Sequence, residues 1–259
     1  MKIDMLELDY AFKKAVRKNC FPGSDGITPK DIISQEEFIN SIAYDLKNDC
    51  YIPRQPLVFY LFKSINSPQK IRIEACCLAD RIVEFSIRSY LEKYYFDRFN
   101  NSYDYRKGKQ FKAFVLCIEK MLRTYSYINI CDIGSFYKSC RFDKINEQLV
   151  NDGVDHTIIN LIKKCLFTYN LEENGLPLGH VLSNIMSDIF LIDIENKFIK
   201  NDIIFIRYID CFVFFFKSKT ALRDKTIIDK IVADSSIEFN KEKSIQLCSP
   251  TIEVVKKYL

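Results

Sequence analysis

The stretch "IRYIDCFVFFF", residues 206–216, decides the fold of this chain. It contains a short β-rich run, a tight turn that carries Asp210, and a second run that is almost wholly apolar, so it predicts a β-hairpin. The second strand is too apolar to lie anywhere but in a core. An acid at the tip of such a hairpin is a candidate site residue, although aspartate also fills tight turns for conformational reasons alone.

A second acid occupies a similar place earlier in the chain. The run "YINICDIGSFY", residues 127–137, alternates like a buried strand, ends on Asp132 and is broken by Gly134. If the two strands are neighbours, both carboxylates reach the same edge of the sheet. Paired carboxylates repel each other unless a cation lies between them, and their hard oxygens suit Mg²⁺ or Mn²⁺. Together the acids predict a metal site for phosphoryl transfer, whereas either one alone is better read as a turn residue.

The order of elements predicts the fold class. From residue 127 the pattern gives a strand, helices, the hairpin, another helix and a last short strand, which is an α+β domain with a mostly antiparallel sheet backed by helices. Apolar spacing predicts a helix over 181–199 with one buried face. Upstream, residues 56–77 predict a further hairpin, and helices are expected over 4–18 and 35–48.

Composition sets the broad class of the protein. A chain of 259 residues with 48% hydrophobic content can bury a full core, and its apolar runs are far shorter than the roughly 20 residues that cross a bilayer. The first residues are charged and helix-like rather than typical of a signal sequence. A cytoplasmic location with no membrane partner is therefore expected.

The cysteines and histidines predict neither disulfides nor zinc. Ten cysteines are scattered along the chain without a CxxC pair, and the two histidines, His156 and His180, lie far apart. A zinc site is therefore not expected from the sequence.

The positive charge lies mainly in the first half of the chain. Residues 1–130 contain 21 Lys/Arg and 16 Asp/Glu, whereas residues 131–259 contain 17 and 18. The run "YRKGKQFK", residues 105–112, is the densest basic stretch and has aromatic residues between the bases, a pattern that suits phosphate contacts as well as a solvated face. The candidate nucleic-acid-binding residues are Arg106, Lys107, Lys109 and Lys112.

Eight segments in order resemble one family. "CDIGSFYKSC", "NGLPLGHVLSNIMSDIFL", "FIRYIDCFVFF" and "IEFNKEKSIQL" resemble the palm motifs of reverse transcriptases. Upstream, "PGSDGIT", "YIPRQP", "KIRIEACCLADRIVEFSI" and "NSYDYRKGK" resemble finger-region motifs of bacterial retroelement enzymes of the group II intron, retron, diversity-generating and abortive-infection types. The resemblance covers about residues 20–247. It implies a right-hand polymerase with fingers over 1–126, a palm over 127–247 and a short tail over 248–259 in place of a thumb.

The resemblance assigns roles in the palm. Asp132 and Asp210 correspond to the catalytic pair that binds Mg²⁺ or Mn²⁺. Tyr137 would stand under the incoming sugar as the gate against a 2′-hydroxyl, and is otherwise a core aromatic residue. Lys243 resembles the last palm motif's lysine, a proton donor to pyrophosphate or else a solvated base.

The resemblance also implies a nucleotide-binding surface. Lys63 and Arg72 fall where finger residues hold the triphosphate, and Arg81 is expected to pair with a carboxylate that braces the fingers. Three further nucleotide-binding residues form a turn that lets template and nucleotide approach the backbone closely. They are Gly175, Pro177 and Gly179.

Three departures from the family pattern affect the expected activity. Cys211 replaces the second hairpin acid, and a neutral thiol is a poor ligand for Mg²⁺, so metal affinity is expected to fall, which is as consistent with weakened activity as with none. Leu178 replaces the usual glutamine, which suggests relaxed template fidelity. The segment after Lys243 is too short for a helical thumb, so a protein partner or self-assembly is expected to supply one.

Three functions remain open at this stage. The first is an RNA-directed DNA polymerase, a nucleotidyltransferase that uses dNTPs and an RNA template or non-coding RNA to make DNA, in bacterial antiphage defence. The second is a catalytically weakened RNA-binding or structural subunit beside an active partner, suggested by Cys211. The third is a palm-fold nucleotidyltransferase that uses no template.

Overall fold

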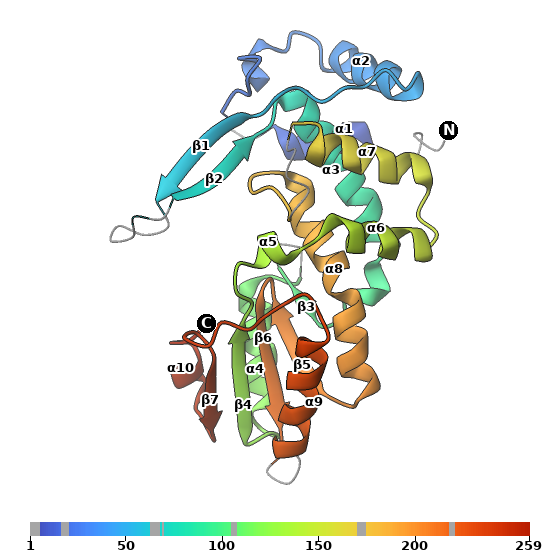
Figure 1. Ribbon diagram of the computed structural model, residues 1–259. Helices are drawn as coiled ribbons and strands as arrows, with labels where there is room; N and C mark the ends of the chain where they lie inside the picture. Colours follow the sequence, from blue (N-terminus) through green and yellow to red (C-terminus); the bar gives the residue numbers. More distant parts are fainter. Residues whose placement is uncertain are drawn as a thin grey trace. The chain divides into compact units, whose positions relative to one another are not determined.

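The computed structural model describes residues 6–16, 21–62, 68, 70–104, 108–169, 175–217 and 221–259. The chain divides into two compact units (Figure 1), and each unit is built from two separate stretches of sequence. Unit 1 contains Met1–Tyr95 with Cys140–Ile189, and unit 2 contains Phe96–Ser139 with Phe190–Leu259. The boundaries of these compact units differ from those of the predicted fingers, palm and tail. The functional division into fingers, palm and tail stays a prediction. None of the described helices combines the length and apolarity that a membrane span needs.

Unit 1 is mainly helical and has one hairpin. Its packing centres on α3, whose buried side chains include Ile82, Ile87 and Leu91. Side-chain caps start two of its helices, since Ser34 accepts a hydrogen bond from the Glu37 N–H and Asp155 accepts one from the Thr157 N–H. The helices are α1 (Leu8–Ala15), α2 (Gln35–Lys47), α3 (Leu78–Tyr94), α6 (Phe142–Asn151), α7 (His156–Phe167) and the first half of α8 (Val181–Lys200), with a 3-10 turn at Pro29–Asp31.

The hairpin of unit 1 pairs β1 (Leu57–Phe62) with β2 (Lys70–Ala75). The strands are antiparallel, with Leu57 opposite Ala75 and Phe62 opposite Lys70, so the hairpin predicted over 56–77 is present. Every residue of β1 is exposed despite its apolar sequence. Strand composition therefore does not by itself decide burial, which depends on whether another layer covers the strand.

Unit 2 is built on a five-stranded sheet in the order β3-β5-β6-β4-β7. All neighbours are antiparallel except β3 and β5, which are parallel. The strands are β3 (Ser102–Tyr103), β4 (Tyr127–Asp132), β5 (Ile204–Tyr208), β6 (Cys211–Phe216) and β7 (Ile245–Cys248). The other elements are the 3-10 turn Phe96–Arg98 and the helices α4 (Phe111–Met121), α5 (Phe136–Ser139), α9 (Ala221–Ala233) and α10 (Ile252–Val255), with the end of α8. The predicted α+β class and mostly antiparallel sheet are confirmed.

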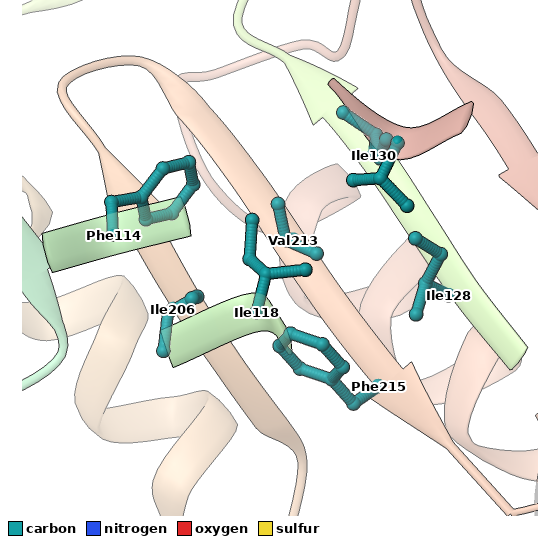
Figure 2. Close-up of a cluster of buried hydrophobic side chains, with 8 residues drawn as sticks. Phe114, Ile118, Ile128, Ile130, Ile206, Val213 and Phe215 are labelled. Carbon is teal, nitrogen blue, oxygen red and sulfur yellow. The ribbon is translucent and has the colours of Figure 1, made fainter. Parts of the chain in front are cut away.

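Both faces of this sheet are buried, which explains the apolar run "CFVFFF". On one face, Phe114 and Ile118 of α4 pack against alternate residues of three strands and against Val255 of α10 (Figure 2). On the other face, Phe212 and Phe214 of β6 pack against Phe198 of α8 at ring distances of 5.9 and 5.2 Å. A central strand covered on both sides reads as a continuous apolar run rather than an alternating one.

Two details differ from the sequence-based expectation. Helix α8 was expected to have one buried face, but its polar residues Ser183, Ser187 and Glu195 are buried as well. The serines can be buried because their hydroxyls bond to nearby carbonyls, as Ser183 does to that of Pro177 at 2.5 Å, and Glu195 because it pairs with Arg207. The predicted tail contains α10, which Thr251 caps by accepting from the Val254 N–H, and Val255 lies in the core of unit 2.

Candidate active site

Two acids lie at the same edge of the unit 2 sheet. Asp132 is the last residue of β4, and Asp210 lies in the two-residue turn between β5 and β6. In the pairing of β4 with β6, Asp132 stands directly opposite Cys211. The N–H of Ile133 donates to the carbonyl of Asp210 at 3.1 Å. β4 and β6 are therefore neighbours, which was the condition for both carboxylates to reach one edge of the sheet, and we call Asp132 and Asp210 the acid pair.

The turn that carries Asp210 is conformationally strained. Ile209 has a φ of 56°, in the left-handed region that a β-branched residue rarely adopts. Such a conformation costs of order 1–3 kcal/mol and persists only where the surroundings impose it. Here the Ile209 N–H donates to the Tyr103 carbonyl at 3.1 Å, and its own carbonyl accepts from Arg207 Nη1 at 2.6 Å.

Arg207 is a supporting residue that sequence reasoning missed. It is fully buried, and its Nε donates to Glu195 Oε1 of α8 at 2.6 Å. This ion pair anchors the turn to the helix behind the sheet. The available signal was a single arginine in an otherwise apolar strand, because a buried charge needs a partner.

The acid pair concentrates negative charge. Burial raises the pKa of Asp210, and the neighbouring charge of Asp132 raises it further. Lys243 partly neutralises this charge through an ion pair, in which its Nζ donates to Asp132 Oδ2 at 2.6 Å. That bond raises the pKa of Lys243. The Asn240 N–H bonds to the Asp132 carbonyl at 2.8 Å, which holds the turn before Lys243 beside β4. Two carboxylates that already attract an ammonium group fit a hard divalent cation such as Mg²⁺.

Cys211 is a neutral member of this site. Burial, with the charges of Asp132 and Asp210, raises the pKa of its thiol to about 12. Its side chain also packs against the apolar cluster under α4. An uncharged thiol is a poor ligand for Mg²⁺, so the donor set consists of the two carboxylates.

The sequence matches the family described as "Reverse transcriptase (RNA-dependent DNA polymerase)" over residues 63–255. The chain belongs to this reverse transcriptase family. The search of curated proteins gave no match.

Solved structures of telomerases share the fold. Apo telomerase from Candida tropicalis is 14% identical with a TM-score of 0.55, over 82% of this chain and 49% of that one. Telomerase from Candida albicans, solved with the TWJ fragment of telomeric RNA, is 12% identical with a TM-score of 0.56, over 83% of this chain and 46% of that one. The chain thus spans about half the length of the structures it matches, and at this identity the likeness concerns the fold alone.

The predicted nucleotide-binding residues of this reverse transcriptase domain that the structure describes include four in unit 1. Arg72 of β2 forms an ion pair with Glu74, which sequence reasoning did not single out. Gly179 has a φ of +104°, and a Cβ there would overlap the carbonyl group of Glu74. The Glu74 N–H donates to the Leu178 carbonyl at 2.7 Å. The loop that carries Gly179 therefore lies directly on β2, and only glycine permits this approach.

The same loop contains Gly175 and Pro177. Gly175 has a φ of 96°, again in the left-handed region, and the Pro177 carbonyl accepts from Ser183 Oγ in the first turns of α8. The predicted close-turn geometry at these positions is present. Their contact with a template or nucleotide stays a prediction.

Tyr137 lies in unit 2 with the acid pair. It is half-buried on α5, and its ring packs on Phe136 at a centroid distance of 5.4 Å. The sugar-gate role stays a prediction.

Of the predicted basic residues, Lys63, Arg106 and Lys107 lie outside the described residues. Lys109 donates to the Asn100 carbonyl at 2.6 Å and stands over the Tyr103 ring at 4.8 Å, so part of its charge is used within unit 2. Lys112 is exposed in the first turn of α4.

Arg81 corrects one expectation. It was expected to pair with a carboxylate, but among the described residues its guanidinium Nη2 donates to a backbone carbonyl instead, that of Phe21, at 3.2 Å. Arg81 thus ties α3 to the segment before α2. A backbone acceptor of this kind cannot be read from side-chain identities.

Proposed function

We propose that the chain is an RNA-directed DNA polymerase that adds dNTPs to a growing DNA strand on an RNA template. The observation that carries this proposal is the acid pair, with Asp132 at the end of β4, Asp210 in the turn that leads into the neighbouring strand β6, and Lys243 bound to Asp132. Membership of the reverse transcriptase family supports the same reaction class. A bacterial antiphage role and a cytoplasmic location are further parts of the proposal, and they rest on the motif resemblance and the composition. The protein partner expected from the sequence stays a prediction.

Residues of each unit have a role in this proposal. Asp132 and Asp210 would hold divalent metal with their carboxylates. Bound there, the metal would supply activation of the attacking 3′-hydroxyl and stabilisation of the charge on the leaving pyrophosphate. Lys243, kept protonated by Asp132, is the proton donor to the pyrophosphate. Arg72 offers one edge of its guanidinium to Glu74, and its remaining N–H groups, on a side chain 41% exposed, are the donors for a triphosphate.

A weakened, RNA-binding subunit is the second candidate function. Cys211 favours it, because a thiol stands opposite Asp132 where the family has a second hairpin acid. Loss of one carboxylate lowers the charge available to a divalent ion. In this second reading the fold is retained for binding and the chemistry belongs to a partner.

The experiment is dNTP incorporation by the purified chain on a primed RNA template with Mg²⁺ and then Mn²⁺. We expect Asp132→Asn and Asp210→Asn each to reduce incorporation more than about 100-fold, since replacing even a residue that only supports a metal ligand costs 10–100-fold. Asp234→Asn is the matched control, because Asp234 is an exposed acid of unit 2 just after α9. Incorporation that survives both acid-pair substitutions would refute the proposal, and equal incorporation without template would indicate an untemplated transferase.

A further inference from the structure

A buried cluster in unit 1 brings together three potential metal ligands. Cys76 follows β2, Glu84 lies in α3, and His180 precedes α8. His180 Nδ1 is 2.6 Å from Glu84 Oε1 and 3.4 Å from Cys76 Sγ, and Cys76 Sγ is 3.6 Å from Glu84 Oε1. All three side chains are buried. His180 lies 104 residues after Cys76 and 96 residues after Glu84, which is why Cys and His spacing did not predict a zinc site.

The other polar atoms of these side chains are already held in place. Glu84 Oε2 accepts from the N–H groups of Val181 and Leu182 at 2.6 and 3.3 Å, which turns Oε1 toward His180. His180 Nε2 lies 3.0 Å from Glu74 Oε2, and Glu74 is in turn paired with Arg72. A histidine that ligates a metal through one nitrogen commonly donates its other N–H to a carboxylate in this way. Nδ1 of His180, Oε1 of Glu84 and Sγ of Cys76 therefore lie within 3.6 Å of one another.

The separations can be compared with those around tetrahedral zinc. Standard bond lengths place a sulfur ligand about 3.5 Å from a nitrogen or oxygen ligand of the same ion, and N and O ligands about 3.4 Å apart. The two distances to Cys76 Sγ, 3.4 and 3.6 Å, match this geometry. The contact between Nδ1 and Oε1 is a hydrogen bond, so a metal ion must replace its proton and move these atoms apart by about 0.8 Å.

Charge and space also favour a cation at this point. Three buried carboxylates, Glu74, Asp80 and Glu84, line this point. Arg72 pairs with Glu74, and in the metal-free chain the proton on His180, whose pKa, despite burial, the charge of Glu84 raises, balances one further carboxylate; a divalent ion would take over that role. A cavity of about 10 Å³ lies against the cluster and is at the lower limit for one water molecule, the usual additional ligand of an incomplete protein donor set. A thiolate, an imidazole and a carboxylate form a donor set suited to Zn²⁺ rather than Mg²⁺.

We propose that Cys76, Glu84 and His180 form a structural zinc site, with Glu74 orienting the histidine. A bound ion links β2, α3 and the loop before α8 within unit 1. On binding, the Cys76 thiol and His180 Nδ1 lose their protons to solvent, so no oxidant or reductant is needed. The site does not depend on the proposed polymerase activity.

The test is cobalt substitution in the full chain. After chelator treatment, Co²⁺ is titrated in and the thiolate-to-cobalt charge-transfer absorption is followed. We expect one equivalent per chain, displaced by Zn²⁺, with a rise in melting temperature when either metal is added. Cys76→Ser should abolish the charge-transfer absorption, and His180→Gln should weaken cobalt binding at least tenfold. Cys50→Ser and Cys248→Ser are matched controls because both thiols are exposed, and neither should change the titration.

Three results would overturn the site. These are no stoichiometric absorption in the wild-type chain, absorption that persists in Cys76→Ser, and absorption lost in either control variant. If Cys76→Ser does not fold, X-ray absorption at the zinc edge of the wild-type chain decides the question. One sulfur at about 2.3 Å with nitrogen and oxygen neighbours at about 2.0–2.2 Å supports the site, whereas no sulfur or several sulfurs contradict it.

Discussion

The acid pair of unit 2 and the cluster around His180 in unit 1 both gather carboxylates, but they neutralise them differently. In the acid pair, the side chain of Lys243, which is 62% exposed, forms an ion pair with Asp132. Around His180, the partners are buried and come from three separate segments. An open site with hard oxygen ligands suits an ion that is exchanged readily, whereas a buried site with a thiolate and an imidazole suits an ion that is retained.

Gly179→Ala is expected to give the largest effect on the unit 1 side of this comparison. The new Cβ would overlap the Glu74 carbonyl, and the alanine would have to keep the positive φ of Gly179. The free energy of unfolding should therefore fall by more than about 3 kcal/mol. Gly26→Ala is the matched control, because Gly26 has a φ of +72° but no atom within 4 Å of its Cβ position. That control should lose only about 1 kcal/mol in chemical denaturation. Equal losses in the two variants would show that the loop does not pack tightly on β2.

Ionisation of Asp80, in the same unit, should change the free energy of unfolding by up to about 3 kcal/mol as pH changes. Burial raises its pKa from 3.8 to about 6, although hydrogen bonds from Tyr51 and the Arg54 N–H oppose the shift and the charges of Glu84 and Asp25 add to it. Because the folded chain holds this proton more tightly than the unfolded chain, the contribution is fully present below about pH 4. It is lost as pH rises through about 6.

The measurement for Asp80 is denaturant unfolding between pH 4 and 7 in the wild-type chain and in Asp80→Asn. The variant removes this ionisation, so the difference in unfolding free energy between the two proteins should change across that interval. The direction is fixed, since the wild-type chain must lose stability relative to the variant as pH rises. A constant difference would contradict the assigned burial of the charge.

Cys211→Asp, next to the acid pair, is expected to give the smallest effect, a change in metal affinity. A third carboxylate opposite Asp132 should lower the Mn²⁺ concentration needed for half-maximal dNTP incorporation about tenfold, equivalent to about 1.4 kcal/mol. Cys211→Ser controls for loss of the thiol and should leave that concentration unchanged. A similar shift in both variants would mean that the thiol itself interferes. Because Cys211 packs against the apolar cluster, the metal-free aspartate variant should also be less stable than the wild-type chain.

The fold of unit 2 could be predicted because its signals are local. The apolar run after Asp210, the alternating run before Asp132 and the turn between β5 and β6 each specify a strand or a turn within about ten residues. Adjacency of the two strands then places the acids together. The composition of β6 predicted a place in a core, which is confirmed, but the equally apolar β1 is exposed, so composition alone did not decide burial.

The His180 cluster could not be predicted, because its contacts join residues 96 and 106 positions apart. Glu84 gave only a weak signal, an acid among the apolar residues of α3. The Arg81 contact was missed for a different reason, since its acceptor is a backbone carbonyl that every residue has. Long-range side-chain partners depend on how segments pack, and one sequence contains no direct record of that packing.

The central claim is that the acid pair is a working polymerase site, and dNTP incorporation measured side by side for the wild-type chain, Asp210→Asn and Cys211→Asp tests it most directly. We predict incorporation by the wild-type chain on a primed RNA template, its loss in Asp210→Asn and an increase in Cys211→Asp. No incorporation by the wild-type chain, but measurable incorporation by Cys211→Asp, would contradict the claim and assign the chain a binding role.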